Sequence, residues 1–227
     1  MKKDQFKKAN YNKKQTRSAN SVEEAITLLK DTVKGNFDHT FEAQISLKLP
    51  EKSKKDSVRF SFVPVAPFTK AVKVLVLADA QSAQDAKNAG ADYVGLEDLV
   101  EKITAGWKDF DVVIATPTVM PKIAKLGKIL GPMGLMPNPR NETVTTDIEK
   151  VVKSYKGGKL DYKMAESNQI SFKFGKLSQK VEDIMNNYNT AFASLSEELK
   201  KYNGNVISKI YVKSTMSNSV RIAKIIN

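Results

Sequence analysis

The 227-residue sequence contains no cysteine, one histidine (His39) and one tryptophan (Trp107). Without cysteine the chain can form no disulfide, bind no metal through thiolates and use no thiol nucleophile. A single histidine excludes histidine-rich zinc sites. No apolar run reaches the roughly 18 residues of a membrane-spanning helix, and residues 1–20 lack the apolar centre of a secretory signal. We therefore expect no metal, no cofactor and no membrane partner.

Positive charge is the clearest feature of the composition. The chain has 37 Lys and Arg against 25 Asp and Glu, for a net charge of +12. Such a balance is typical of proteins that meet nucleic acid or an anionic membrane surface. Residues 68–159 hold 13 cations against 11 acids, so the excess lies in the two flanking parts. Residues 1–20 carry seven cations and one acid without apolar periodicity, which predicts a flexible basic tail that either folds against RNA phosphates or adds solubility.

The two ends of the chain share an α+β pattern. Ser21 followed three residues later by Glu24 is a capping box, which predicts a helix that ends near Gly35. Residues 37–49 alternate apolar and polar side chains, as in a long strand with one buried and one free face. His39 lies on the apolar face and is interpreted as structural. Further strands are expected at residues 58–63, 160–163, 169–174 and 206–216, the last of which is followed by residues 217–222 without a further predicted strand. A long amphipathic helix is expected to be capped by Ser178.

The middle of the chain has a different pattern. Continuous apolar runs predict buried strands, and they alternate with helical segments, which indicates βαβ units and a parallel sheet. The expected strands are residues 72–78, 92–95 and 110–116, and the expected helices are residues 83–89, 96–105, 119–126 and 146–155. Residues 64–67 and Gly157-Gly158 are interpreted as the two crossings between modules, which side by side would act as a hinge.

The segment from Lys125 to Arg140 contains three glycines, three prolines and three cations counted with its ends. Gly127, Gly131 and Gly134 can take positive φ, and each proline fixes its own φ. We predict a rigid, irregular loop with exposed backbone amides that suits phosphate or RNA backbone. The segment is neither a P-loop nor a dinucleotide fingerprint, and from composition alone an ordinary connector is the favoured interpretation.

Residues 130–140, Leu-Gly-Pro-Met-Gly-Leu-Met-Pro-Asn-Pro-Arg, resemble the signature of the large-subunit ribosomal protein L-one family. Residues 89–95, 106–111, 115–117 and 219–222 are also similar to the family in order and spacing, and the resemblance covers about residues 21–222. It implies a chain with α/β and α+β parts in two domains. An α+β sandwich made of both termini (residues 21–66 and 158–227) would carry an inserted Rossmann-like parallel α/β domain (residues 67–157).

The resemblance implies a structural protein of the mobile stalk that binds large-subunit rRNA directly. The reading surface would be the free sheet face and its loops, where small polar side chains match 2′-hydroxyls, Phe37 offers a stacking plane and lysines attract phosphates. Without the resemblance, the favoured interpretation of each residue taken singly is an ordinary core or sheet residue. The expected rRNA-binding residues are Asn36, Phe37, Asp38, Thr40, Glu42, Thr215, Met216 and Ser217.

Two departures from the family affect the expected affinity. The family continues the Thr-Met pair with Gly-Pro, whereas this chain has Ser217-Asn218, and a glycine there would allow positive φ or close backbone approach. The turn at residues 164–168 lacks the family's basic, glycine-containing pattern.

The middle module is expected to make a second contact with RNA or tRNA through Lys122, Lys125, Lys128 and Arg140. The implied partners are large-subunit rRNA, exit-site tRNA and the messenger of its own operon, which it would repress. A free monomer that joins the cytoplasmic ribosome is expected, in a bacterium rather than an organelle.

The alternative is an α/β enzyme that acts on a phosphorylated small ligand, with Asp79, Glu97 and Asp111 near the carboxyl ends of strands. The sequence has no nucleophile elbow, no catalytic cysteine and no second histidine, so a binding module is favoured.

Overall fold

The computed structural model describes residues 17–33, 37–49, 58–165, 167–202 and 206–223. Asn36 and the predicted tail up to residue 16 lie outside the described residues. The chain divides into two compact units. The first contains the described residues of Met1–Ser57, Met164–Met185 and Lys200–Asn227, and the second contains Val58–Lys163 and Asn186–Leu199. The predicted domain boundaries stay a prediction.

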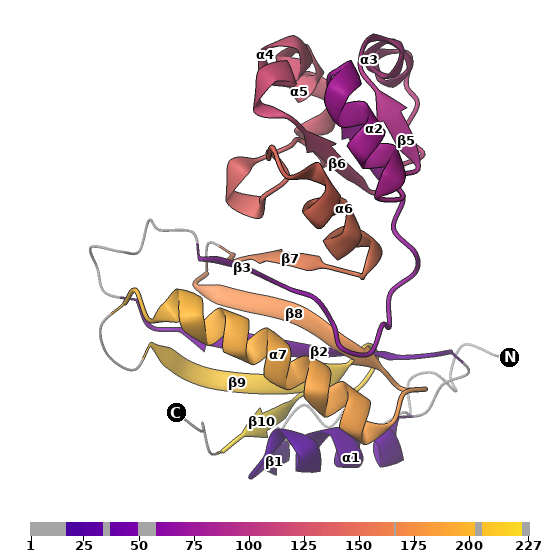
Figure 1. The fold of residues 1–227 in the computed structure, drawn as a ribbon. Helices are drawn as coiled ribbons and strands as arrows, with labels where there is room; N and C mark the ends of the chain where they lie inside the picture. The colour runs from indigo at the N-terminus through magenta and orange to yellow at the C-terminus, as the bar shows by residue number, and fades with distance from the viewer. Residues whose placement is uncertain (1–16, 34–36, 50–57, 166, 203–205, 224–227) are drawn as a thin grey trace, which may run out of the picture. The chain divides into compact units, whose positions relative to one another are not determined.

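The first unit is built on a five-stranded sheet with the order β1-β10-β9-β2-β8 (Figure 1). The β1–β10 pair is parallel and the other pairs are antiparallel. The strands are β1 (Arg17–Ala19), β2 (Thr40–Leu47), β8 (Gln169–Lys176), β9 (Ile207–Ser214) and β10 (Val220–Ile222). β1 corrects the prediction of a tail that extends to residue 20, because Arg17–Ala19 pairs with β10 and supplies a buried Ala19.

Helix α1 (Val22–Thr32) begins as the capping box predicts. The Glu24 N–H donates to Ser21 Oγ at 3.2 Å, and the Asn20 N–H donates to the Glu24 carboxylate at 2.8 Å. One orphan amide of the first turn, that of Glu24, and the amide of the residue before the N-cap are thereby satisfied. Ala25, Ile26 and Leu29 form its buried face.

Helix α7 (Val181–Leu199) starts two residues later than a cap at Ser178 would place it. Ser178 does not cap it, because the Ser178 N–H and Oγ both bond to the Asp38 carboxylate at 3.0 Å. At its start α7 packs closely on β8: a Cβ built on Gly175 would lie 2.9 Å from Ile184 Cγ1. Glycine therefore sets the spacing between helix and sheet here.

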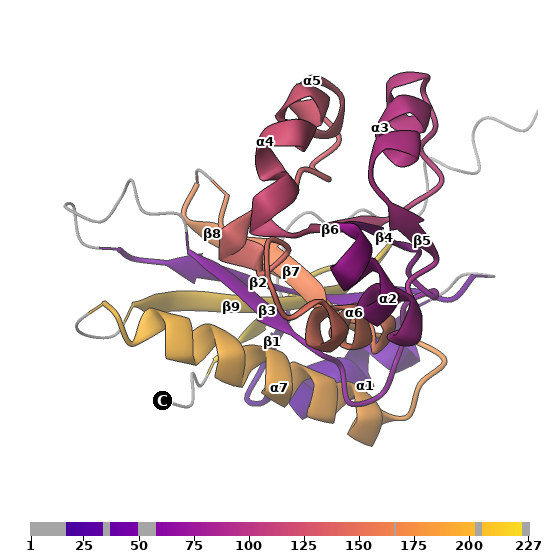
Figure 2. The ribbon, with the colours of Figure 1, turned by 45° about the horizontal axis from the view of Figure 1, so that its top comes forward.

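The second unit is a three-layer α/β arrangement on a parallel sheet with the order β5-β4-β6 (Figure 2). Successive side chains of a strand point to opposite faces, so β4 buries residues on both. Leu75 and Leu77 pack in the cluster with α3 to α5, and Val74 and Val76 pack in the cluster with α2 and α6. The parallel sheet predicted from the apolar runs is confirmed.

The elements of the second unit are as follows. The parallel strands are β4 (Val74–Leu77), β5 (Tyr93–Gly95) and β6 (Val112–Ala115), and β3 (Arg59–Phe62) pairs antiparallel with β7 (Leu160–Lys163). The helices are α2 (Ala80–Asn88), α3 (Glu97–Thr104), α4 (Met120–Ile123), α5 (Gly127–Leu130) and α6 (Ile148–Lys156). Short 3-10 turns are η3 (Pro117–Val119), η4 (Ala124–Leu126) and η5 (Pro139–Asn141).

The glycine-rich segment is more regular than predicted. Gly127 begins α5, and Gly131 has helical angles (φ −59°, ψ −57°), so neither uses positive φ. Only Gly134 among the three does, with φ +71°. Gly131 is required for space instead, because a Cβ there would lie 2.5 Å from the Gly127 carbonyl oxygen.

Candidate nucleic-acid interface

Two segments predicted to bind rRNA meet at one end of the five-stranded sheet. The Thr40 N–H, at the start of β2, donates to Thr215 Oγ1 at 3.0 Å, and Thr215 follows the last residue of β9. Beside this contact two large apolar side chains stand in solvent: Phe37 is 51% exposed and Met216 is 77% exposed. The sheet therefore brings residues 37–40 and 215–216 to one surface.

The turn after β9 is closed by a serine side chain. The Ser217 N–H donates to the Ser214 carbonyl at 3.1 Å, and Ser217 Oγ accepts from the Ser214 N–H at 2.8 Å. Ser217 is not among the described residues with positive φ. The turn therefore forms without the glycine that the resemblance implied at this position, and the Ser217 hydroxyl ties the turn to the end of β9.

Two predicted acidic residues make contacts within the first unit. Asp38 holds the chain before α7 through Ser178 and lies 3.7 Å from the Lys176 ammonium. Glu42 lies 3.6 Å from the Lys213 ammonium. A carboxylate repels phosphate, and pairing with lysine reduces that repulsion.

The free face of the sheet follows the alternation seen in the sequence. Along β2 the even-numbered residues from Thr40 to Ser46 are half-exposed while the odd-numbered ones are buried. The register places Glu42 between Lys173 and Lys213, and Ser46 opposite Lys209. On β10, the exposed Arg221 pairs with Tyr211. Sequence reasoning did not name these four cations, because the pattern of a single strand does not show which residues of the neighbouring strands lie beside it. The alternation of side chains within residues 206–216 was the one signal for a lysine-bearing free face.

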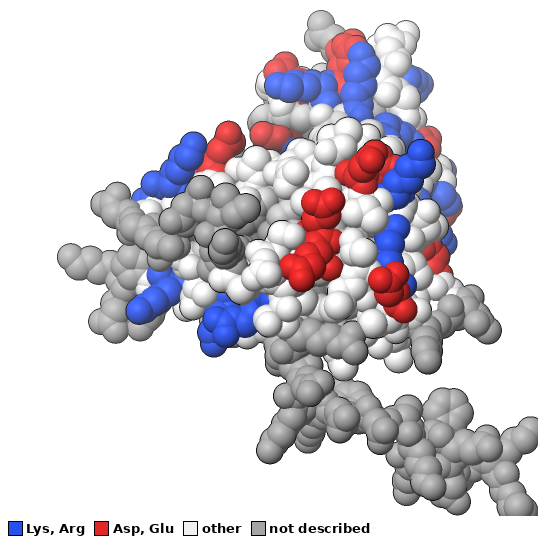
Figure 3. All heavy atoms as spheres, turned by 90° about the horizontal axis from the view of Figure 1, so that it is seen from below, with Lys and Arg blue, Asp and Glu red and all other residues white. Residues whose placement is uncertain are grey.

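Charges of both signs are interspersed on the side of the molecule seen from below (Figure 3). Lysines and arginines there alternate with carboxylates rather than forming a field of one sign. On the described part of this side, net charge alone therefore marks no binding surface.

Three predicted cations of the second unit share one face of a helical run. Lys122, Lys125 and Lys128 are exposed, whereas Ile123 and Leu126 are buried. The run alternates short 3-10 and α segments from Pro117 to Leu130. Residues three apart are neighbours on a helical surface, so each lysine lies next to the following one. Within the described residues none of them forms an ion pair.

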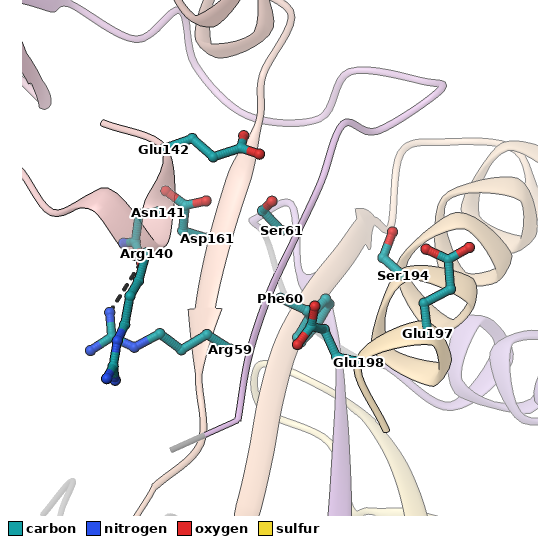
Figure 4. Close-up of a pocket in the computed structure, with 10 residues that line it drawn as sticks. All are labelled: Arg59, Phe60, Ser61, Arg140, Asn141, Glu142, Asp161, Ser194, Glu197 and Glu198. Carbon is teal, nitrogen blue, oxygen red and sulfur yellow. Dashed lines mark hydrogen bonds between the residues drawn. The ribbon is translucent and has the colours of Figure 1, made fainter. Parts of the chain in front are cut away.

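Arg140, the fourth predicted cation, lines a cavity of about 220 Å³ in the second unit (Figure 4). The lysines do not line it. Arg59 also lines it, and Arg59 Nη1 donates to Asn141 Oδ1 at 3.0 Å. Glu197 and Glu198 of α7 also line the cavity. This mixture of signs does not define an anion site.

A polar network anchors the chain beside this cavity. The Tyr155 hydroxyl donates to the Asp161 carboxylate at 2.6 Å, and the nearly buried Lys159 ammonium lies 2.5 Å from Glu142. Burial raises the pKa of Asp161, although the Tyr155 hydroxyl opposes that shift. The Lys159 ammonium holds the pKa of Glu142 below its usual value. These contacts hold η5 and β7 together and leave no arrangement of acid, base and nucleophile.

The residues considered for an enzyme do not converge. Asp79 follows β4 and accepts from Thr118 Oγ1 at 2.7 Å, and Glu97 begins α3 after β5. Asp111 was expected near the same edge, but it precedes β6 and accepts from the Lys73 N–H, so it lies at the amino ends of the strands. Within the described ranges no cluster of His, Asp and Glu could hold a metal ion, and no helix is long and apolar enough to cross a membrane.

The basic two-unit chain, with its half-exposed polar sheet face, has the features of the class of nucleic-acid-binding proteins. Residues 29–218 match the ribosomal protein L1p/L10e family. The chain therefore belongs to that family, and it is a ribosomal, RNA-binding protein.

Named relatives agree with this assignment. The chain is 42% identical over 205 residues to large ribosomal subunit protein uL1 of Bifidobacterium animalis subsp. lactis, with 88% of each chain covered. It is 39% identical over 203 residues to uL1 of Lactobacillus acidophilus, covering 89% of this chain and 88% of the relative. It is 40% identical over 200 residues to uL1c of Guillardia theta, covering 88% and 86%.

Proposed function

We propose that this chain is a structural constituent of the large subunit of the cytoplasmic ribosome and binds large-subunit rRNA in the mobile stalk through its first unit. The observation that carries the proposal is the contact between Thr40 and Thr215, which places Phe37 and Met216 on one surface. Thr215 Oγ1 and the neighbouring backbone offer donors and acceptors to 2′-hydroxyls, and the exposed apolar side chains can contact unstacked bases.

The free sheet face supplies the phosphate contacts in this proposal. Lys209 and Lys213 of β9 lie beside the polar residues of β2, and Arg221 lies one strand further away, on β10. Neutralised phosphates release counterions, so binding weakens with salt in proportion to the number of contacts. Specificity then comes from the end of the sheet near Thr215, and the lysine-bearing face adds affinity that does not depend on sequence.

A salt-titrated binding assay tests the proposal. Stalk rRNA is the ligand, and an unrelated structured RNA is the competitor. Thr215→Ala and Met216→Ala are expected to weaken specific binding while leaving the competitor's affinity unchanged. Met133→Ala is the matched control, since Met133 is a 37%-exposed methionine of the second unit. Equal affinity for both RNAs, lost by about 200 mM salt, would show phosphate attraction only and reject the proposed site.

The second unit is proposed to contact exit-site tRNA and to assist release of deacylated tRNA. Its aligned Lys122, Lys125 and Lys128 can track a phosphate backbone. Replacing all three with Gln is expected to lower tRNA affinity and reduce the salt slope by about 2 to 3, with rRNA binding unchanged. The matched control replaces Lys87, Lys102 and Lys108, which are exposed lysines of the same unit. An equal loss in both triple variants would reject a localised contact.

Repression of its own operon is proposed on the same surface. A messenger that folds into the rRNA shape would meet the same side chains, so the two RNAs should compete for one site. Thr215→Ala is then expected to weaken both complexes by a similar factor. Simultaneous binding of both RNAs would contradict a shared site.

A further inference from the structure

His39 is buried completely, yet its imidazole makes no hydrogen bond. Its exposed fraction is 0%, and neither Nδ1 nor Nε2 has a partner among the described residues. A buried polar group without a partner is unfavourable. The ring nitrogens therefore do not explain the presence of His39, and another part of the side chain must have a role.

The flat face of the ring is what the structure uses. The Phe37 and His39 rings are stacked, with centroids 4.0 Å apart and planes inclined by 14°. Phe37 is 51% exposed, so one face of its ring lies on His39 while much of the rest meets solvent. Because an exposed aromatic side chain has free rotamers, a fixed plane beneath it removes conformational freedom before a ligand arrives.

Hydrogen bonds fix the chain at residues 38–40. The Asp38 carboxylate bonds to Ser178, the His39 carbonyl accepts from the Leu177 N–H at 2.8 Å, and the Thr40 N–H donates to Thr215. Three consecutive residues are thus bonded either to the segment between β8 and α7 or to the turn after β9. The imidazole is a rigid plate at the edge of the candidate interface.

We propose that His39 is a positioning residue that holds the Phe37 ring as a platform for one unstacked RNA base. The stack has three layers: base, Phe37 and His39. This inference rests on the proposed rRNA-binding function of the first unit and adds to it the residue that orients Phe37. Aromatic stacking of a base requires a π-face and no sequence-specific hydrogen bond.

Three variants test the platform against stalk rRNA. His39→Leu keeps an apolar side chain but removes the plate, and we expect it to weaken binding by about five- to tenfold, as loss of one base stack does. Phe37→Leu is expected to do the same. The double variant should be no weaker than either single one, because both changes remove one stack. His39→Phe restores a flat ring and should bind like the wild type.

The salt dependence of binding separates stacking from charge. His39→Leu should lower affinity at every salt concentration without changing the salt slope, because no phosphate contact is lost. Thermal unfolding of each variant shows whether the fold is intact. Additive losses in the double variant, or His39→Phe binding as weakly as His39→Leu, would overturn the platform.

The single histidine allows a direct measurement by proton NMR on untagged protein. The imidazole protons should be shifted upfield by the stacked Phe37 ring, and the shift should vanish in Phe37→Leu. It should persist in the RNA complex if His39 remains the plate. Loss of the shift on binding would mean that Phe37 leaves His39, and the platform is wrong.

The result also separates this inference from the function on which it rests. If Thr215→Ala and Met216→Ala weaken binding while His39→Leu does not, the platform is wrong and the proposed rRNA-binding site is retained. If none of these variants affects binding, both the platform and the proposed site are wrong.

Discussion

Replacement of Gly131 by alanine tests the packing of the glycine-rich segment. The new Cβ would lie 2.5 Å from the Gly127 carbonyl oxygen, closer than real contacts allow. The same carbonyl accepts from the Gly131 N–H at 3.0 Å, and the Gly131 carbonyl accepts from Gly134, so the segment cannot move aside without weakening these bonds. Overpacking of this kind costs about 2 kcal/mol.

Gly127→Ala is the matched control, four residues earlier in the same segment. Its backbone is helical, and nothing lies within 4 Å of the added Cβ. An alanine at a helical position without a clash stabilises by roughly 0.5–1 kcal/mol. The same chemical change should therefore have opposite signs at the two glycines, with a difference of roughly 3 kcal/mol.

Trp107 reports this unit specifically. It is the only tryptophan, and it packs against the cluster that contains Leu130. In urea, with a slope of about 2 kcal/mol per molar, the midpoints of the two variants should differ by about 1.5 M. Equal midpoints, or a Gly131→Ala protein as stable as the wild type, would refute the close-approach argument.

Three further predictions concern other positions. Gly134→Ala should cost about 1 kcal/mol because φ is +71°, and Gly134→Asn should cost less in the same urea assay. Burial raises the pKa of Asp92, but the Lys156 ammonium at 2.6 Å and the Val74 N–H outweigh it and hold the pKa below its usual value. The Asp92 carboxylate therefore stabilises the second unit at neutral pH, and this stabilisation is lost as the pH falls below about 4. Asp92→Asn should lower the urea midpoint at neutral pH and should have the same midpoint as the wild type in acid. Ser217→Ala should keep the fold but weaken rRNA binding by about threefold, about 0.6 kcal/mol, because the loss of its hydroxyl loosens the turn that carries Met216; unchanged affinity would mean that the turn needs no side-chain closure.

Local patterns predicted most of the secondary structure correctly. The capping box at Ser21, the alternation along β2 and the apolar run of β4 each depend on neighbours in sequence, and each forms the expected element. The prediction failed where a partner distant in sequence decides. β1 forms only because β10 lies beside it, and Ser178 bonds to Asp38 rather than capping α7.

The sequence by itself determined that this chain is a basic, cysteine-free RNA-binding protein of the ribosomal protein L1p/L10e family, because composition and the motif around Leu130 to Arg140 are properties of the chain. The sequence could not show that Gly131 is required because a Cβ would not fit there, rather than because the backbone has a positive φ. Only tertiary structure decided that Thr40 meets Thr215, that Phe37 lies on His39, and that lysines of β9 flank β2. These contacts join segments through strand register and packing, which no single stretch of sequence specifies.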